Sequence, residues 1–249
     1  MAFEDVAALA IPALFLAFLV AERLMGGGRA FPTVRYWTLL GFVGLFVSGA
    51  VNAILPAALT PHLGTIHLVD LSSLGLTGAG PAVVLTTFFT YWTHRIQHRF
   101  DILWRLGHQL HHGVARVDVA SGMMFHPIDL VVQVGATTLA AALLGVTANA
   151  AALAGVANFV IALFQHLNVR TPRWVGYLVQ RPEAHCLHHE RDVHARNFGD
   201  LPVWDMLFGT FANPRTGEVQ VGFAPERGRR VLAMIACIDV NQATGRAKL

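Results

Sequence analysis

The most informative pattern along this chain is a series of long stretches without charged residues. They cover residues 6–21, 36–69, 71–94 and 130–169. A helix needs about 20 apolar residues, at about 1.5 Å each, to cross the roughly 30 Å hydrocarbon core of a bilayer. The last stretch is about twice that length and has Gly145 near its middle, so we expect a hairpin of two helices there. The pattern predicts an all-α, polytopic bundle of four to five spans.

The first two uncharged stretches contain features that can be mistaken for a signal peptide or that interrupt a helix. The first resembles the apolar region of a signal peptide, but the acidic Glu4 and Asp5 stand where a signal peptide carries positive charge. We therefore predict that it stays in the protein as a membrane anchor. In the second stretch we expect a helix over about residues 36–55, followed by an interfacial segment broken by Pro56 and Pro61.

The basic residues sort to one side of this bundle. Three arginines follow the first span, whereas neither the segment after the second span nor the 145–149 turn contains Lys or Arg. Threading five spans from an outside N-terminus puts residues 95–128 and 167–249 inside, and all 18 Lys and Arg are then cytoplasmic. We expect an integral, multi-pass membrane protein whose C-terminus lies on the cytoplasmic side.

The composition supports a membrane protein. Hydrophobic residues make up 54% of the chain and charged residues 13%, which excludes a disordered chain and argues against an ordinary soluble domain. We attribute the net charge of +3 to arginines at a membrane surface and expect no nucleic-acid partner. The two cysteines, Cys186 and Cys237, are too few for a disulfide framework or a Cys-based zinc module.

Eight of the 13 histidines lie in three short motifs, one HxxxH and two HxxHH. Residues three or four apart share a helix face, so each HxxHH directs two imidazoles along one face and a third close beside them. We expect the three to converge on a metal ion, because neutral imidazole binds iron, zinc, copper and nickel well. Eight imidazoles exceed the need of one ion, so two ions are predicted. The motif histidines are His94, His98, His108, His111, His112, His185, His188 and His189.

The remaining histidines divide by predicted position. His126 and His166 are isolated in the sequence, but the topology places both on the cytoplasmic side, so they are candidate ninth and tenth ligands. His62 and His67 fall on the opposite side, where packing or interfacial roles explain them. For His194, a role as a metal ligand and a role in packing or at the interface both stay open.

Several catalytic patterns do not occur in the sequence. Glu190 follows His189 at the wrong spacing for HExxH, and no Gly-x-Ser-x-Gly, P-loop or dinucleotide fingerprint is found. Electrons would therefore come from a partner protein. A metal pair at the lipid boundary suits O2 activation, since an inert C–H bond needs an oxidant stronger than any side chain.

Other residues allow two interpretations each. The aromatic run that ends at Trp92 could line a lipid channel, or could form an interfacial belt or bundle packing. Asp205 could accept a hydrogen bond from a metal-bound imidazole, or could cap a helix. Arg227, Arg229 and Arg230 could contact anionic headgroups or an acidic electron donor, or form a solvated tail.

Half of the chain, about residues 90–213, resembles the fatty acid hydroxylase superfamily, also called the sterol desaturase family. The resemblance rests on His94-Arg-Ile-Gln-His98, His108-Gln-Leu-His-His112, Phe125-His126-Pro127, Phe164-Gln165-His166, Pro182-Glu-Ala-His185-Cys-Leu-His-His189, Asn197-Phe198-Gly199 and Trp204-Asp205-Met-Leu-Phe-Gly-Thr210. It implies an integral membrane oxygenase in which the eight motif histidines, with His126 and His166, bind two iron ions that zinc can replace.

The resemblance also implies an organisation and an activity. We expect membrane-anchor helices over 1–80, a catalytic domain with a helical cytosolic cap over 81–213 and a cytosolic tail over 214–249. The activity would be hydroxylation of a lipid C–H bond with O2 and electrons from a b-type cytochrome, ferredoxin or flavin reductase; desaturation by the same centre is the alternative. The fatty-acid 2-hydroxylase branch has a further histidine where this chain has Arg170, which weakens a sphingolipid assignment. A metal transporter or binding scaffold is a third interpretation, from a different class.

Overall fold

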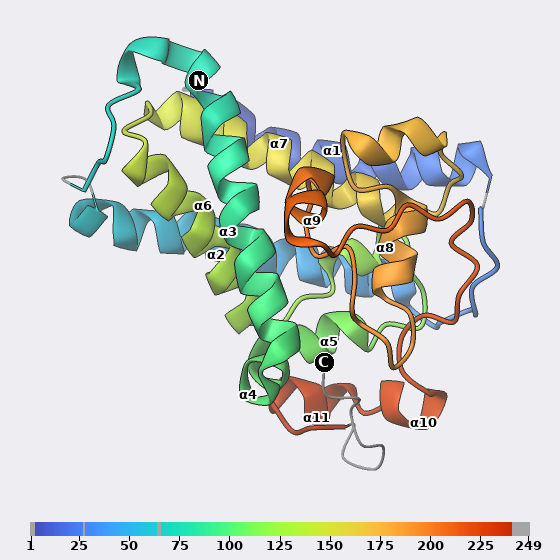
Figure 1. Cartoon of the computed structure of the whole chain (residues 1–249). Coiled ribbons are helices and arrows are strands. Elements are labelled where there is room, and N and C mark those ends of the chain that lie inside the picture. The colour runs from blue at the N-terminus through green and yellow to red at the C-terminus, as the bar shows by residue number, and fades with distance from the viewer. Residues whose placement is uncertain (1–2, 27, 64–65, 241–249) are drawn as a thin grey trace.

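The structure is a computed structural model that describes residues 3–26, 28–63 and 66–240. Within these ranges the protein is helical and has no strand; a single antiparallel bridge joins Glu190 and Val221. Figure 1 shows long helices that run across the molecule, with short helices and loops packed against them on its right-hand and lower sides. The predicted all-α fold is confirmed.

Four helices are long and apolar enough to span a bilayer. The spanning segments are Val6–Met25 of α1 (Phe3–Met25), α2 (Trp37–Leu63), η1 with α3 (Ser72–Gly78 and Ala79–Arg99) and α7 (Ala148–His166). The remaining predicted span is α6 (Pro127–Leu143), which is apolar but shorter, at 17 residues. The predicted hairpin is therefore present, and its two helices meet at a turn through Gly145, whose φ is +55°. By length and composition this is an integral membrane protein.

The predicted break after residue 55 does not occur. α2 continues through Pro56 and Pro61 to Leu63. A proline removes one backbone hydrogen bond, but leaving the helix would expose several unpaired backbone groups. In apolar surroundings those groups find no water to bind, so a continuous helix has the lower free energy.

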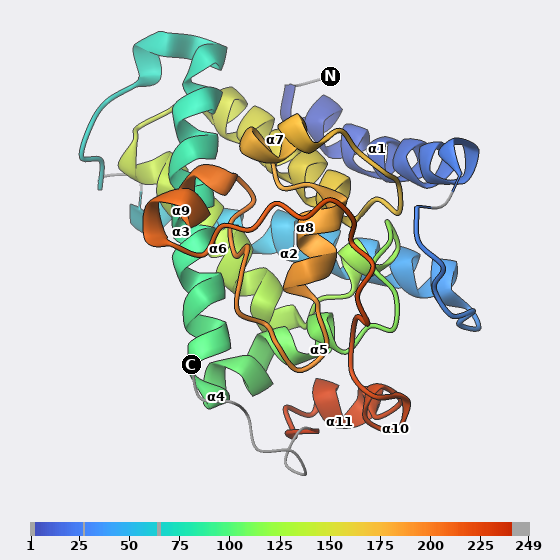
Figure 2. The same ribbon diagram turned by 45° about the vertical axis from the view of Figure 1, so that its right-hand side comes forward.

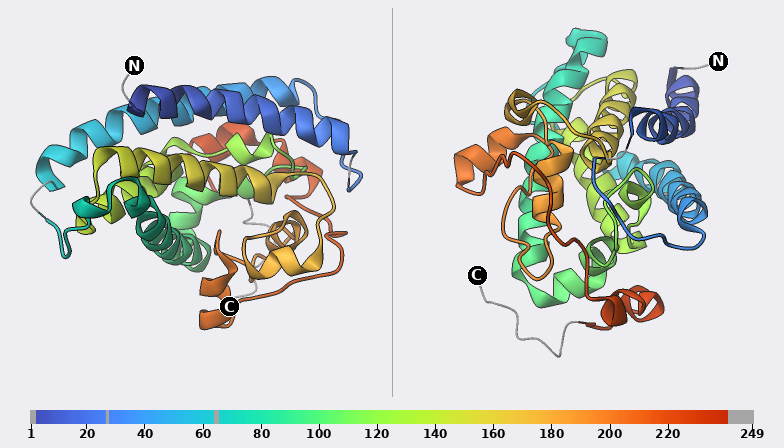
Figure 3. Two further views of the ribbon diagram at one scale, coloured as in Figure 1. Left: turned by 90° about the horizontal axis from the view of Figure 1, so that it is seen from above. Right: turned by 90° about the vertical axis from the view of Figure 1, so that its right-hand side faces the viewer.

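The long helices pack through small residues and aromatic side chains. α1 packs on α7, α2 on α6, and α3 on both α6 and α7. Figure 3 shows α1, α2 and α7 running side by side while α3 crosses them. Ala79 and Ala82 of α3 meet Ala150 and Ala154 of α7 in a buried cluster, where small side chains let two helices approach closely. Outward-facing side chains such as Phe46, which is 79% exposed, suit contact with lipid.

The connections between spans pair at two opposite ends of the bundle. After α1, the backbone N–H of Gly28 donates to the carbonyl of Asn168, which follows α7 (2.9 Å). At the other end, Leu68 donates to the carbonyl of Leu143 (2.8 Å), so the α2–η1 and α6–α7 connections lie together. The spans thus alternate in direction as the threading requires.

Short elements form a cap that connects with the ends of α3 and α7. Figures 1 and 2 place α5 and α8 near the centre of this cap, with α9 beside α3 and the pair α10–α11 at its edge. The elements are α4 (Asp101–Leu103), η2 (Trp104–His108), α5 (Gln109–His112), η3 (Ser121–Met123), η4 (Arg173–Tyr177), α8 (Pro182–His188), α9 (Pro202–Phe208), α10 (Pro225–Gly228) and α11 (Val231–Ile235).

Candidate metal centre

The structure gathers nine histidines into two adjacent groups. Within each group, one ligand atom of every residue lies within 4.8 Å of those of the others. Cluster A is His94, His98, His108, His112 and His188; cluster B is His111, His166, His185 and His189. The two groups touch, since the rings of His112 and His189 stack with centroids 4.2 Å apart. Each group could therefore hold a metal ion.

Each HxxHH motif contributes to both clusters, which corrects the expectation that its three imidazoles converge on one ion. His108 and His112 enter cluster A, while His111 enters cluster B. In the second motif the division is reversed: His185 and His189 enter cluster B, and His188 enters cluster A. The residues four apart stay together on one helix face, and the residue between them points to the neighbouring group.

The first motif follows a local change in helix geometry. Residues Trp104–His108 form a π-helical turn between α4 and α5. A π-turn contains an extra residue, so it rotates the following residues relative to a regular α-helix. Here it ends at His108, which lies beside His94 at the end of α3 with ring centroids 4.4 Å apart.

The inward ring nitrogens have the spacing of ligands that share an ion. The Nε2 atom of His112 lies 3.1 Å from the Nε2 atoms of His108 and of His188. In cluster B, His185 Nε2 lies 3.0 Å from His166 Nε2 and 3.1 Å from His189 Nε2. Two nitrogens bound at right angles to one ion at about 2.1 Å are about 3.0 Å apart.

Several ring nitrogens in these clusters have no protein partner. In cluster A, Nε2 of His94 and of His98 is buried without a hydrogen bond. A buried polar atom without a partner costs free energy, and a cation would satisfy these lone pairs. The residues present therefore fit a metal ion in each cluster.

Burial keeps the cap imidazoles neutral. Loss of solvent lowers the pKa of His112 well below 6.5, and the neighbouring His189 and His194 lower it further. Burial and nearby imidazoles act in the same direction on the pKa values of His111, His185, His188 and His189. A neutral imidazole is the form that binds a metal, so the protein holds these side chains ready as ligands.

Outer partners fix the rings of cluster A. Nδ1 of His94 donates to the carbonyl of Phe198 and Nδ1 of His188 to the carbonyl of Arg196, both at 2.7 Å. His108 Nδ1 lies 2.9 Å from the carboxylate of Asp129. Such bonds set the tautomer in which Nε2 carries the free lone pair. In cluster B, His166 Nδ1 donates to the carbonyl of Ala162 at 2.7 Å.

His194 is a neighbour of cluster A. Its Nδ1 lies 2.9 Å from Nδ1 of His112, so one of these two nitrogens donates to the other. Nε2 of His112 faces the cluster, so His194 contacts the outward nitrogen of His112, just as Asp129 contacts the outward nitrogen of His108. The structure thus places His194 beside a candidate ligand and outside the two clusters.

The structure does not bring His126, one of the ten predicted ligands, into either cluster. Its Nδ1 accepts from the backbone N–H of Ile128 (3.2 Å), and its Nε2 donates to the carbonyl of Ile235 (3.0 Å). The residue is the N-cap of α6, followed by Pro127 in the first helical turn. With both ring nitrogens occupied, His126 joins α6 to the tail helix α11.

Asp205 affects the metal centre indirectly, by holding the loop that contains Phe198 and Gly199. Its carboxylate accepts from the backbone N–H groups of Phe198 (2.8 Å) and Gly199 (2.9 Å) and from the Thr210 hydroxyl (2.6 Å). The carbonyl of Phe198 in turn holds His94. Asp205 thus fixes the segment that orients an imidazole, although it touches no imidazole through these bonds.

Asp129 is the site residue that the sequence interpretation missed. It is 1% exposed, and besides His108 its carboxylate accepts from Gln97 Nε2 at 3.0 Å. The available signal was a single acidic residue in the first turn of an apolar helix, two positions after Phe-His-Pro. An acid in a helix's first turn is common for electrostatic reasons alone, so the pattern did not single it out.

We expect Asp129→Asn to weaken metal binding by about 10- to 100-fold, the usual effect of losing an outer carboxylate partner. The amide is similar in size but lacks the negative charge that favours the N–H tautomer of His108 Nδ1. Metal content after dialysis against graded chelator measures the change. Asp101→Asn, on the exposed side of α4, is the control; equal retention in both variants would contradict the assigned role of Asp129.

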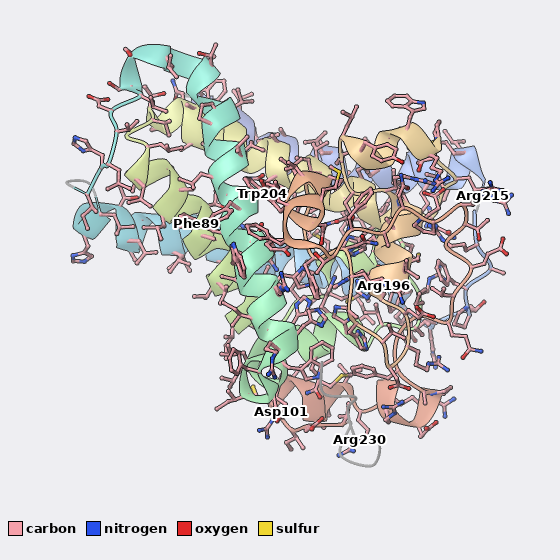
Figure 4. The ribbon with its side chains drawn as sticks, viewed as in Figure 1. Phe89, Asp101, Arg196, Trp204, Arg215 and Arg230 are labelled. Atoms are coloured by element: carbon pink, nitrogen blue, oxygen red, sulfur yellow. The ribbon has the colours of Figure 1, made fainter. Side chains whose placement is uncertain are left out.

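Of the two interpretations of the aromatic run that ends at Trp92, the structure supports bundle packing. Phe88 contacts Trp204 with ring centroids 5.1 Å apart, and Tyr91 stacks on Phe208 at 5.4 Å. Trp204 also donates to the Thr87 hydroxyl at 3.1 Å. Figure 4 shows Trp204 on α9 lying against α3. These aromatic side chains attach α9 to the spanning helix.

A large cavity lies on the other side of the centre, beside α2. Its volume is about 1640 Å³. It is bounded by residues 28–35, the start of α2, residues 113–115 and 123–125, the segment 217–221, and Gly228, Arg229, Val231, Met234 and Ile235. Phe125, one of its walls, stacks on the ring of His111 with centroids 4.3 Å apart and an interplanar angle of 9°. The cavity therefore ends one aromatic ring away from cluster B.

Comparison with known proteins agrees with this architecture. The profile of the fatty acid hydroxylase family matches residues 81–210, over half of the chain. An ornithine lipid hydroxylase, OlsE of Rhizobium tropici, is 32% identical over 160 residues, 62% of this chain and 48% of that protein. An alkylglycerol monooxygenase of Danio rerio is 28% identical, over 53% of this chain and 30% of the relative.

A further relative extends the range of activities. A Delta(7)-sterol-C5(6)-desaturase of Nicotiana tabacum is 29% identical over 53% of this chain and 48% of its own length. The matches thus span half or less of the length of these curated relatives. No solved structure matches the chain significantly. The family match and the histidine motifs that fall within it show that the chain belongs to the fatty acid hydroxylase family.

Proposed function

We propose that this protein is a membrane oxygenase that hydroxylates a C–H bond of a lipid, using O2, a pair of iron ions and electrons from an external donor. The observation that carries the proposal is the pair of buried imidazole clusters in direct contact with each other. The relatives named above as lipid hydroxylase and monooxygenase support this type of reaction.

The mechanism assigns the chain's residues to holding and shielding the centre. Cluster A would hold one iron ion and cluster B the other; zinc can replace iron during purification, because imidazole sites accept both. When bound, the iron pair supplies O2 activation and oxidation of the C–H bond. The chain contributes neutral ligands, fixed by Asp129 and by the carbonyls of Arg196 and Phe198. It also excludes water, since both His112 and His189 have no exposed surface.

We further propose that the clusters and the C-terminus lie on the cytoplasmic side. The positive-inside pattern supports this orientation, and the pairing of the α1–α2 connection with the end of α7 agrees with it. The electron donor would then be a cytoplasmic or membrane-bound b-type cytochrome, ferredoxin or flavin reductase. The catalytic unit would be residues 81–213, with 1–80 as anchor and 214–249 as tail.

Desaturation by the same centre is the second candidate, because sterol desaturases are among the relatives. A metal transporter fits less well. A transport path places ligands along the middle of the spans, whereas here they lie at the ends of α3 and α7 and in the cap.

Comparing lipid extracts from cells with and without the protein tests the proposal. Hydroxylation adds one oxygen to the product mass, and desaturation removes two hydrogens. We expect a lipid with one added oxygen, absent from cells that carry His188→Ala. Unchanged lipids, together with fewer than about one transition metal ion per chain after anaerobic purification, would refute an oxygenase.

A further inference from the structure

The cavity beside α2 has an unbalanced set of charged residues. Five arginines line it: Arg29, Arg35, Arg170, Arg191 and Arg229. Glu218 is the acidic residue in the same lining, and it lies 3.6 Å from Arg170. Among the described residues, the other four arginines form no ion pair with a carboxylate. The cavity therefore presents a net positive surface of about four charges to whatever occupies it.

These arginines are positioned differently. Arg29 is half-buried; it donates to the carbonyl of Leu167 (3.0 Å), while its Nε is buried without a partner. Arg191 donates to the carbonyl of Gly222 (3.2 Å) and to the side chain of Gln220 (3.0 Å). Arg35 and Arg229 are exposed. Half-buried and exposed guanidinium groups together suit a phosphate or carboxylate group, which accepts several N–H bonds at once.

The rest of the lining is apolar and follows a spanning helix. Leu40, Val43 and Val47 of α2 contribute to it, together with Met123 and Phe125. Arg35 lies just before α2 begins at Trp37, and residues 40–47 lie further along the span. The cavity thus has one charged end outside the helix and an apolar end that extends into the membrane region.

We propose that this cavity binds a lipid with an anionic headgroup, with the headgroup among Arg29, Arg35 and Arg229 and a hydrocarbon chain along residues 40–47 of α2. Phe125 separates the cavity from His111, so a chain in this position lies next to cluster B. Identifying this lipid as the substrate rests on the proposed function. The binding of the lipid does not, because charge complementarity and the apolar lining alone support it.

Lipid selection by the purified protein tests this inference without any turnover. The protein in neutral detergent is incubated with equal amounts of a phosphatidylglycerol and a phosphatidylcholine that carry the same acyl chains, and the retained lipids are counted by native mass spectrometry. We expect the anionic lipid to be retained about five- to tenfold in excess. Arg35→Gln/Arg229→Gln should bring this ratio close to one.

A matched variant distinguishes the cavity from general attraction to a basic surface. Arg215→Gln/Arg230→Gln removes the same charge from exposed positions that do not line the cavity, and Figure 4 shows both residues at the periphery. It should leave the ratio unchanged. An equal loss in both double variants, or no preference in the wild type, would overturn the inference. Val47→Trp, which fills the apolar end, should reduce retention of both lipids; unchanged retention would also overturn it.

The outcomes for this inference and for the proposed function can be distinguished. Selective retention of the anionic lipid without oxidation of any lipid would leave the binding site standing and count against the oxygenase. Oxidation of a lipid by a protein that shows no headgroup selection would support the oxygenase and overturn the proposed binding site.

Discussion

Replacing His188 by alanine is expected to reduce lipid oxidation to below about 1% of the wild-type rate. Losing an outer partner of a metal ligand costs about 10- to 100-fold, so losing a ligand itself should cost more. His188 comes from α8 but completes cluster A, where its Nε2 lies 3.1 Å from that of His112. Product formation per chain and metal content after anaerobic purification measure the effect. We expect metal content to fall from about two ions per chain.

Variants of other histidines serve as comparisons. His185→Ala should have an equal effect through cluster B. His62→Ala, at an exposed position near the end of α2, should leave activity and metal content unchanged. Activity of His188→Ala within about tenfold of the wild type would contradict the assignment of cluster A as part of the catalytic centre.

Arg181→Met is expected to lower the free energy of unfolding by about 3–5 kcal/mol, because it removes one partner of a buried ion pair. Arg181 is 1% exposed and Glu183 3%, and their side chains are 3.1 Å apart. Arg181 also donates to Asn213 Oδ1 (2.8 Å) and to the carbonyl of Thr171 (3.1 Å). Methionine leaves these acceptors and a buried carboxylate without the cation.

Equilibrium unfolding in mixed micelles measures this loss. Arg215→Met, at an exposed position in the same region, should change the free energy of unfolding by no more than about 0.5 kcal/mol. Arg181→Met/Glu183→Leu should recover part of the loss, since removing both charges removes the penalty for the unpaired one. A loss below about 1 kcal/mol in the single variant would show that the pair does not hold the start of α8.

The same pair predicts a pH dependence. Burial would raise the pKa of Glu183, but hydrogen bonds from Thr171 and Arg181 outweigh it and hold this pKa below 4.5. The carboxylate therefore stabilises the fold above about pH 4.5, and this contribution is lost as the pH falls through the lowered pKa. The stability difference between wild type and Glu183→Gln, measured by the same unfolding experiment, should be full at pH 7 and shrink as the pH falls below about 4.5. A constant difference would contradict the assignment.

The spans and the histidine motifs were readable because each depends on local sequence. Charge-free length identifies a helix that can cross a bilayer, and the spacing of His94 and His98 fixes a shared face whatever the tertiary structure. The sequence could not predict that each HxxHH motif would supply histidines to both clusters. This division depends on how α5 and α8 face each other, which is a property of packing between distant segments.

The places where the structure differs from the sequence predictions have two causes. Proline usually breaks a helix in a soluble protein, but α2 continues through Pro56; inside a bilayer, a break would leave backbone groups without water to pair with. His126 looked like a ligand from its motif, but its ring nitrogens cap α6 and bind Ile235, more than 100 residues away. The cavity combines the 28–35 segment with residues 217–235, and no local pattern connects these two parts of the chain.

The ligand set described above also determines the charge balance of the centre. Nine imidazoles contribute no negative charge, and Asp129 is the carboxylate that hydrogen-bonds to one of them. Cations held there would keep most of their charge, unlike those in a carboxylate-bridged site. Small anions such as azide, cyanide or formate should therefore compete strongly for any open coordination position, and the choice of buffer salt should affect the measurements of metal binding and lipid oxidation made on this protein.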